Sequence, residues 1–226
     1  MRVDIWSDVV CPWCYIGKRR FEAALGRFPH REQVEVSWRA FELDPTAPAE
    51  HPGAYADRLA EKYGTRPEAA EQMIAQLTAT AAEEGLNLFF DRARPGNTRD
   101  AHRLMHLAAT RGKQDQLAER LFRASFVEGE PVGLSPTLVR LATDVGLDAD
   151  EVWRVLDSEA YGDAVQAEES AAADLGIRAV PFFVIDGRYG VSGAQPAEML
   201  LQALEQAWED RSSALRAGRE GDSCAV

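Results

Sequence analysis

VDIWSDVVCPWC, residues 3–14, begins with strand character and ends in two cysteines that are separated by two residues. A strand is predicted over residues 2–6, where apolar and charged side chains alternate. Pro12 fits the first turn of a helix, where a missing N–H costs no hydrogen bond. Cys11 and Cys14 therefore stand at a junction between a strand and a helix, where two thiols can close into a disulfide and reopen.

The Cys11–Cys14 pair has the spacing of a catalytic dithiol. The thiolate is the attacking species in disulfide exchange, and the N-terminus of a helix favours an anion. We therefore predict that Cys11 is the exposed nucleophile. Cys14 lies one helical turn later and should be further inside, which suits a residue that resolves the mixed disulfide.

Zinc is the main alternative for these cysteines. Cys11 and Cys14, together with His102 and His106, formally offer two thiols and two imidazoles. The long gap between the two pairs differs from the short spacing of common zinc modules. We therefore expect no metal and no cofactor.

The composition bounds the function. The chain has 226 residues, a formal net charge of −12 and only three cysteines. Phosphates and anionic lipids would repel so acidic a protein, so we expect no nucleic acid and no membrane partner. No signal peptide and no apolar stretch of about 20 residues is visible. We therefore expect a cytoplasmic protein whose partners are protein or small-molecule thiols and disulfides; the sequence leaves the oligomeric state open.

The chain is predicted to be an α/β protein with three structured parts and a C-terminal tail. Residues 1–44 predict a β-α-β unit, and residues 176–210 a β-β-α unit. Between them, residues 45–175 form a helical block. Residues 211–226 are expected to be a flexible tail, because they are polar and small.

The expected elements follow from hydrophobic periodicity and from capping residues. Asp186-Gly187 is a strong hairpin signal between two of the strands. Asn97 and Thr98 form a predicted helix cap. The predicted helices of the block cover residues 55–63, 67–84, 99–111, 114–128, 135–145 and 149–175.

Together these features resemble the DsbA-like thioredoxin superfamily and, within it, the FrnE-type oxidoreductases. The resemblance covers essentially the whole chain. The motifs that carry it are Asp4-Ile5-Trp6-Ser7-Asp8, Cys11-Pro12-Trp13-Cys14-Tyr15-Ile16-Gly17, Asn97-Thr98, Ala101-His102-Arg103-Leu104, Val180-Pro181-Phe182-Phe183 and Ser192-Gly193-Ala194-Gln195-Pro196.

The resemblance implies a thioredoxin-like fold with a large helical insertion and a thiol–disulfide oxidoreductase or disulfide isomerase. It also implies that Val180-Pro181 is a cis bond beside Cys11, so that Pro181 shapes a substrate groove. Relatives include 2-hydroxychromene-2-carboxylate isomerases and kappa-class glutathione transferases, in which the cysteine pair is typically replaced. A small-thiol-dependent isomerase or transferase is therefore the alternative, and the retained Cys14 argues against it. A second redox centre is not expected, because only Cys224 lies near the C-terminus.

The candidate substrate-binding residues are Pro12, Trp13, Val180, Asn97 and His102. Trp13 lies between the cysteines, where its ring can serve as a platform or pack as an ordinary aromatic side chain. His102 is either a structural helical histidine or a residue that faces the cysteines and moves protons. Asp8 is either a proton acceptor for Cys14 or an ordinary loop residue, and the sequence does not decide between these roles.

Overall fold

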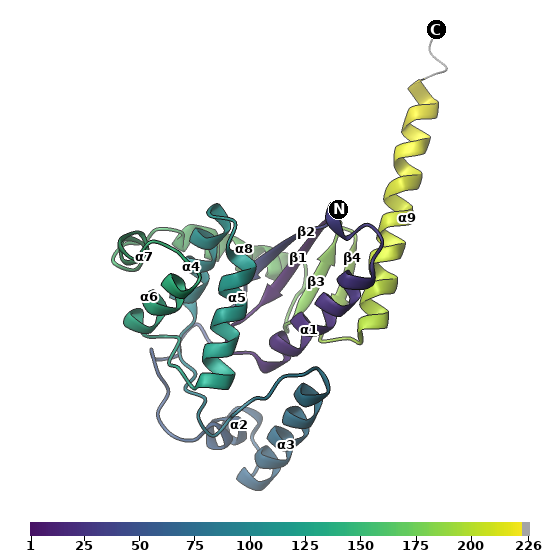
Figure 1. Ribbon diagram of the computed structural model, residues 1–226. Helices are drawn as coiled ribbons and strands as arrows, with labels where there is room; N and C mark the ends of the chain where they lie inside the picture. Colours follow the sequence, from purple (N-terminus) through teal and green to yellow (C-terminus); the bar gives the residue numbers. More distant parts are fainter. Residues whose placement is uncertain (223–226) are drawn as a thin grey trace.

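The computed structural model describes the backbone of residues 1–222 and the side chains of residues 1–213. A four-stranded sheet runs through the molecule in the order β2-β1-β3-β4, and Figure 1 shows helices on both sides of it. The strands are β1 (Arg2–Ser7), β2 (Glu35–Ala40), β3 (Phe182–Ile185) and β4 (Tyr189–Ser192). The helices are α1 (Pro12–Arg27), α2 (Tyr55–Tyr63), α3 (Pro67–Glu83), α4 (Arg99–Thr110), α5 (Gln114–Arg123), α6 (Ser135–Asp144), α7 (Ala149–Leu156), α8 (Gly162–Asp174) and α9 (Ala197–Asp222).

The strand pairing confirms the predicted β-α-β and β-β-α halves. β1 runs parallel to β2 and antiparallel to β3, so that Ile5 lies opposite Trp38 on one side and Phe183 on the other. β3 and β4 form the predicted hairpin. Residues 186–188 connect the two strands, and the N–H of Arg188 donates to the carbonyl of Ile185 at 3.1 Å. Asp186 and Gly187 have φ values of 52° and 67°, the positive values that the two central residues of a type I′ turn adopt. The two halves therefore share one sheet with β1 near its centre.

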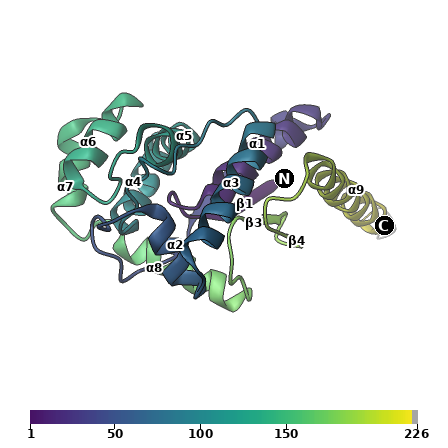
Figure 2. The same cartoon turned by 90° about the horizontal axis from the view of Figure 1, so that it is seen from below.

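The helical block covers the β2 edge of the sheet, whereas α9 lies near the β4 edge. Figures 1 and 2 show α4 to α8 gathered on one side and α9 on the other, with α2 and α3 paired below the sheet. Buried side chains from the sheet, from α1 and from the helical block belong to one continuous hydrophobic core. The proposed division at residues 44/45 and 175/176 into two domains stays a prediction.

The single helix expected over residues 149–175 is wrong. The chain forms α7 and α8 instead, with a break before Tyr161, whose φ is 63°. The cause is a tertiary contact, because the buried guanidinium of Arg103 donates hydrogen bonds to the carbonyls of Val155, Ser158 and Ala160. These carbonyls lie within and after the last turn of α7, and the arginine holds the chain in the bend.

The prediction that the last helix gives way to a tail at residue 211 is also wrong. Helix α9 continues to Asp222. The segment after Asp210 contains alanine, leucine and arginine, which are favourable in helices. Residues 223–226, including Cys224, lie outside the described residues. No helix in the described part of the chain has the length and apolar character needed to cross a membrane.

Candidate active site

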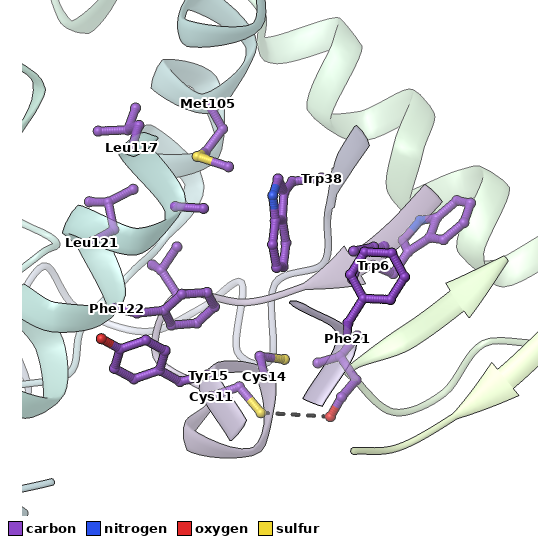
Figure 3. Packing of buried hydrophobic residues seen from close by; sticks show 14 of the residues in the cluster. Trp6, Cys11, Cys14, Tyr15, Phe21, Trp38, Met105, Leu117, Leu121 and Phe122 are labelled. Atoms are coloured by element: carbon purple, nitrogen blue, oxygen red, sulfur yellow. Dashed lines mark hydrogen bonds between the residues drawn. The ribbon is translucent and has the colours of Figure 1, made fainter. Parts of the chain in front are cut away.

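Cys11 lies at the N-terminus of α1, shortly after the end of β1. It is the N-cap residue and has an extended backbone. The backbone N–H of Cys11 donates to the carbonyl of Asp8 at 3.0 Å, which fixes the preceding turn. Its Sγ donates to the carbonyl of Val180 at 3.6 Å, the contact that the dashed line in Figure 3 marks. The motif and the Val180 loop are therefore adjacent, although 169 residues separate them.

The expectation that Cys11 is exposed is wrong, because the residue is only 6% exposed. The Val180 loop covers the sulfur on one side. Burial raises the pKa of Tyr55 in α2, and the negative charge of a Cys11 thiolate raises it further. The Val180 loop is distant in sequence from Cys11, so local sequence does not reveal that it lies against the sulfur.

Cys14 lies one turn further along α1 and is fully buried. Burial raises the pKa of its thiol well above the usual value, and the neighbouring Cys11 raises it further. Cys14 is therefore held as a thiol while Cys11 stands nearer the surface. The roles of Cys11 as nucleophile and Cys14 as resolving residue stay predictions.

The peptide bond between Val180 and Pro181 is cis, as the family resemblance implied. The Pro181 ring packs on Gly17 of α1, three positions after Cys14. A Cβ atom on Gly17 would lie 2.8 Å from Pro181 Cγ and 3.5 Å from the ring of Phe183. Only a glycine at this position lets the loop approach the motif helix so closely.

We therefore expect Gly17→Ala to displace the Pro181 loop from Cys11. The proline ring is rigid, so the backbone must move, and the expected cost is about 1–3 kcal/mol of stability together with a loss of disulfide-exchange rate. Gly26→Ala is the matched control, because no atom lies within 4 Å of a Cβ there. That substitution should instead stabilise α1 by up to about 1 kcal/mol. Thermal unfolding and turnover check both, and an unchanged Gly17→Ala enzyme would contradict the close packing.

The two residues between the cysteines differ in exposure. Pro12 is buried, and Trp13 is 44% exposed. An exposed indole at the mouth of the motif is compatible with a substrate platform, which remains a proposal. Val180 is buried and contacts the site through its carbonyl.

Asn97 contacts the connector, the segment between β2 and α2, and not the cysteines. Its Nδ2 donates to the carbonyl of Pro45 at 3.1 Å, and its Oδ1 accepts the N–H of Arg99 at 3.0 Å. Thr98 is the N-cap residue of α4 but makes no capping bond with its side chain. The helix cap is therefore provided by Asn97 and not by Thr98. These contacts give Asn97 a structural role and do not support its assignment to a substrate site.

His102 lies behind the motif and is buried against Asp8. Its Nε2 is 3.7 Å from Asp8 Oδ1, which is an ion-pair distance and too long for a hydrogen bond. Burial lowers the pKa of His102, but Asp8, Glu42 and Glu168 outweigh it and raise the pKa above the usual value. The Asp8 carboxylate also accepts the backbone N–H of Leu43 at 2.8 Å. Asp8 therefore ties the motif loop to the chain after β2.

His106 belongs to a separate charged group on the same side of the sheet. Its Nε2 lies 3.2 Å from Glu168, which also accepts from Arg39 and from the N–H of Ala40, each at 2.7 Å. The histidines thus face carboxylates and not the cysteine pair. In the described residues no group of three or more histidine, cysteine or acidic side chains could hold a metal ion.

Glu42 is a buried carboxyl whose titration should be visible in the stability. Burial and the nearby Glu169 raise its pKa to about 7, although His102 and Arg99 act in the opposite direction. A raised pKa means that the folded state binds more protons than the unfolded state, so this group stabilises the fold at low pH and loses that contribution as pH rises from about 4.5 to about 7.

We expect Glu42→Gln to remove this dependence. The melting temperature of the variant relative to the wild type should be a few degrees higher at about pH 8 than at about pH 5. Glu35→Gln, which changes an exposed carboxyl on β2, is the control and should show no such difference. Equal shifts at both pH values would contradict a protonated Glu42 in the folded protein.

Helix α5 anchors the helical block to the motif helix. Tyr15, directly after Cys14, stacks on Phe122 with 5.1 Å between ring centroids, and its hydroxyl donates to Glu119 at 2.8 Å. Lys18 is 2% exposed and pairs with Glu119 at 3.4 Å. Figure 3 shows Tyr15, Phe122 and the cysteines in one neighbourhood. The position of α1 is therefore set by the insertion as well as by the sheet.

The sequence analysis missed Glu119, and it quoted Ser7 only within a motif. Glu119 comes from a helix that only the tertiary fold brings to the motif, and no local signal marks it. Ser7 did carry a signal, because it shares alternate positions on β1 with the buried Val3 and Ile5. A polar side chain in that apolar row is a candidate for a role at the site.

Comparisons with known proteins show the family and the fold. The sequence model of the family described as "DSBA-like thioredoxin domain" matches residues 2–205. The chain is 29% identical over 206 residues to the uncharacterized protein YwbO of Bacillus subtilis, covering 90% of this chain and 96% of that one. It is 49% identical to the probable DsbA oxidoreductase SCO1869 of Streptomyces coelicolor, with a TM-score of 0.88 and coverage of 92% and 90%. A 2-hydroxychromene-2-carboxylate isomerase shares the fold, with 16% identity, a TM-score of 0.64 and full coverage of both chains.

Proposed function

The chain belongs to the DsbA-like thioredoxin domain family, and from that premise we propose that it is a thiol–disulfide oxidoreductase that acts through Cys11 and Cys14. The observation that carries the proposal is the placement of the Cys11 sulfur at the start of α1, against the Val180 carbonyl, with the Cys14 thiol one turn behind it.

The proposed reaction has two exchange steps. The Cys11 thiolate attacks one sulfur of a substrate disulfide, which forms a mixed disulfide and releases the first substrate thiolate. Cys14 then loses its proton and attacks the Cys11 sulfur, which forms the Cys11–Cys14 disulfide and releases the second substrate thiolate. Oxidation of a substrate dithiol is the reverse of these steps.

Substrates of this reaction are protein or small-molecule thiols and disulfides. The exposed Trp13 offers an apolar surface next to Cys11, and the Val180–Pro181 loop lies on its other side. An acidic protein whose cysteine pair is catalytic fits a cytoplasmic setting, where a thiol pool can return the pair to the reduced state. The FrnE-type assignment and disulfide isomerisation are part of the same proposal.

A small-thiol-dependent isomerase or glutathione-transferase-like enzyme is the alternative on the same fold. Such an enzyme needs a single activated sulfur, whereas this chain also keeps Cys14 in a fully buried position behind Cys11. The second thiol supports redox exchange over the alternative.

Reduction of insulin by dithiothreitol tests the proposal, with refolding of scrambled ribonuclease as the assay for isomerase activity. We expect catalysed insulin reduction by the wild type, with Gly26→Ala as an active control. Insulin reduction no faster than with dithiothreitol alone would overturn the oxidoreductase proposal. Activity on ribonuclease in addition would extend it to isomerisation.

A further inference from the structure

Arg20 of the motif helix α1 joins parts of the molecule that lie far apart in the sequence. Its side chain is only 16% exposed. The Nε atom donates to the carboxylate of Glu84, the residue that ends α3, at 2.6 Å. The Nη1 atom donates to the carbonyl of Ala194 at 2.6 Å. Because a guanidinium carries several donors in one rigid plane, this side chain holds both acceptors at once.

The Ala194 carbonyl belongs to the loop between β4 and α9, and this loop supports Pro181. The backbone N–H of Gly193, directly before Ala194, donates to the carbonyl of Pro181 at 2.8 Å. A displacement of Ala194 therefore displaces Gly193 and the hydrogen bond that holds Pro181. Arg20 is connected to the Val180–Pro181 loop through two neighbouring residues, although it touches neither Val180 nor Pro181 with a hydrogen bond of its own in the described structure.

Three attachments hold the Val180–Pro181 loop on α1, and they differ in strength. The Cys11 sulfur contacts the Val180 carbonyl at 3.6 Å, but a thiol is a weak donor. The Pro181 ring packs on Gly17, a contact without direction. Arg20 lies three positions after Gly17, on the same face of the helix, and its two hydrogen bonds are charge-assisted. Arg20 therefore provides the strong directional attachment of the three.

We propose that Arg20 is a positioning residue for exchange with protein disulfides, because it fixes the Val180–Pro181 loop relative to Cys11. The inference rests on the proposed function, in which this loop flanks the attacking sulfur. A protein disulfide brings a chain that has to lie along the loop, whereas a small disulfide needs only the sulfur. The role of Glu84 is to orient the guanidinium, so Glu84 acts through Arg20.

Arg20→Met tests the proposal, because methionine keeps an apolar stem and removes both hydrogen bonds. We expect kcat/KM for insulin reduction to fall by about tenfold or more, since a misplacement of about 1 Å at a reacting site can cost about a hundredfold. Attack by reduced Cys11 on Ellman's reagent, a small disulfide, releases one thionitrobenzoate, and the rate of this first release should be unchanged. Arg20→Lys keeps the charge without the planar fork and should reduce insulin at an intermediate rate.

A double-mutant cycle tests whether Glu84 acts through Arg20. Glu84→Ala should lower kcat/KM for insulin by a smaller factor than Arg20→Met does, because the bond to the Ala194 carbonyl remains. In the Arg20→Met background the same substitution should cause no further loss, since effects that pass through one shared partner do not add. Losses that multiply in the double variant would contradict the orienting role of Glu84.

Arg27→Met is the matched control. Arg27 is another arginine of α1 and pairs with Glu198 at 2.7 Å, but its side chain is 54% exposed. Both activities should be unchanged in this variant.

Two results would overturn the proposal: insulin reduction by Arg20→Met as fast as by the wild type, or an equal fractional loss of both activities, which is the result of a general structural defect. Thermal unfolding verifies that each variant is folded at the assay temperature. If Arg20→Met does not fold, Arg20→Lys decides in its place by the same two activities. A wild type that does not reduce insulin would instead refute the proposed function, so the two failures are distinguishable.

Discussion

Replacing Cys11 with serine should abolish disulfide exchange while the protein stays folded. A hydroxyl does not attack a disulfide at neutral pH, so we expect turnover to fall by about three orders of magnitude or more, as for other removed nucleophiles. The serine hydroxyl can still donate to the Val180 carbonyl that the Cys11 sulfur contacts. Insulin reduction measures the loss, and thermal unfolding verifies the fold.

The matched control for this variant is Cys224→Ser. The sequence around Cys224 is small and polar, without an apolar pattern, and no second redox centre is expected near the C-terminus, so we predict that Cys224 is dispensable. The activity of Cys224→Ser should therefore equal that of the wild type. Substantial turnover by Cys11→Ser would show that another thiol is the nucleophile and would remove Cys11 from the mechanism.

Replacing Cys14 with serine should convert the enzyme into a trap. Cys11 can still attack a disulfide, but no second thiol follows, so the mixed disulfide should accumulate on Cys11. We expect turnover to fall by about a hundredfold or more, with a covalent adduct that survives denaturation without reductant and disappears when dithiothreitol is added. Mass spectrometry identifies the adduct and its position.

Two features make this variant informative. Cys14 is fully buried, so a serine there can lose stability by about 1–3 kcal/mol through an unpaired hydroxyl; Cys14→Ala avoids that hydroxyl and should trap the same adduct. The variant with both cysteines replaced should form none. Full turnover by Cys14→Ser would instead favour the small-thiol-dependent alternative, in which Cys11 acts alone.

Local sequence was sufficient for the elements that local physics determines. Alternating residues predicted β1, Asp186-Gly187 predicted the hairpin, and Pro12 predicted the start of α1. These features depend on side-chain periodicity and on backbone preferences within a few residues. The positions of Cys11 and Cys14 relative to each other follow from the same information.

Tertiary contacts determine the features that the sequence did not predict. Arg103 binds three carbonyls and breaks the helix expected over residues 149–175. The Val180 loop lies against a cysteine that its neighbours in sequence suggested would be exposed. Asn97 was assigned to a substrate site because of a motif, although its contacts are with the connector. In each case the deciding group is distant in sequence, and no pattern near the residue records it.

Equilibration with glutathione redox buffers, followed by acid quenching, alkylation and peptide mass analysis, tests the central claim most directly. The claim is that Cys11 and Cys14 form a reversible dithiol–disulfide pair. We predict that the peptide containing both residues loses two hydrogens as the buffer becomes more oxidising, and regains them when the buffer is reversed. Cysteines that remain separately alkylated across the whole range, or a stable glutathione adduct on Cys11 without a Cys11–Cys14 disulfide, would contradict it.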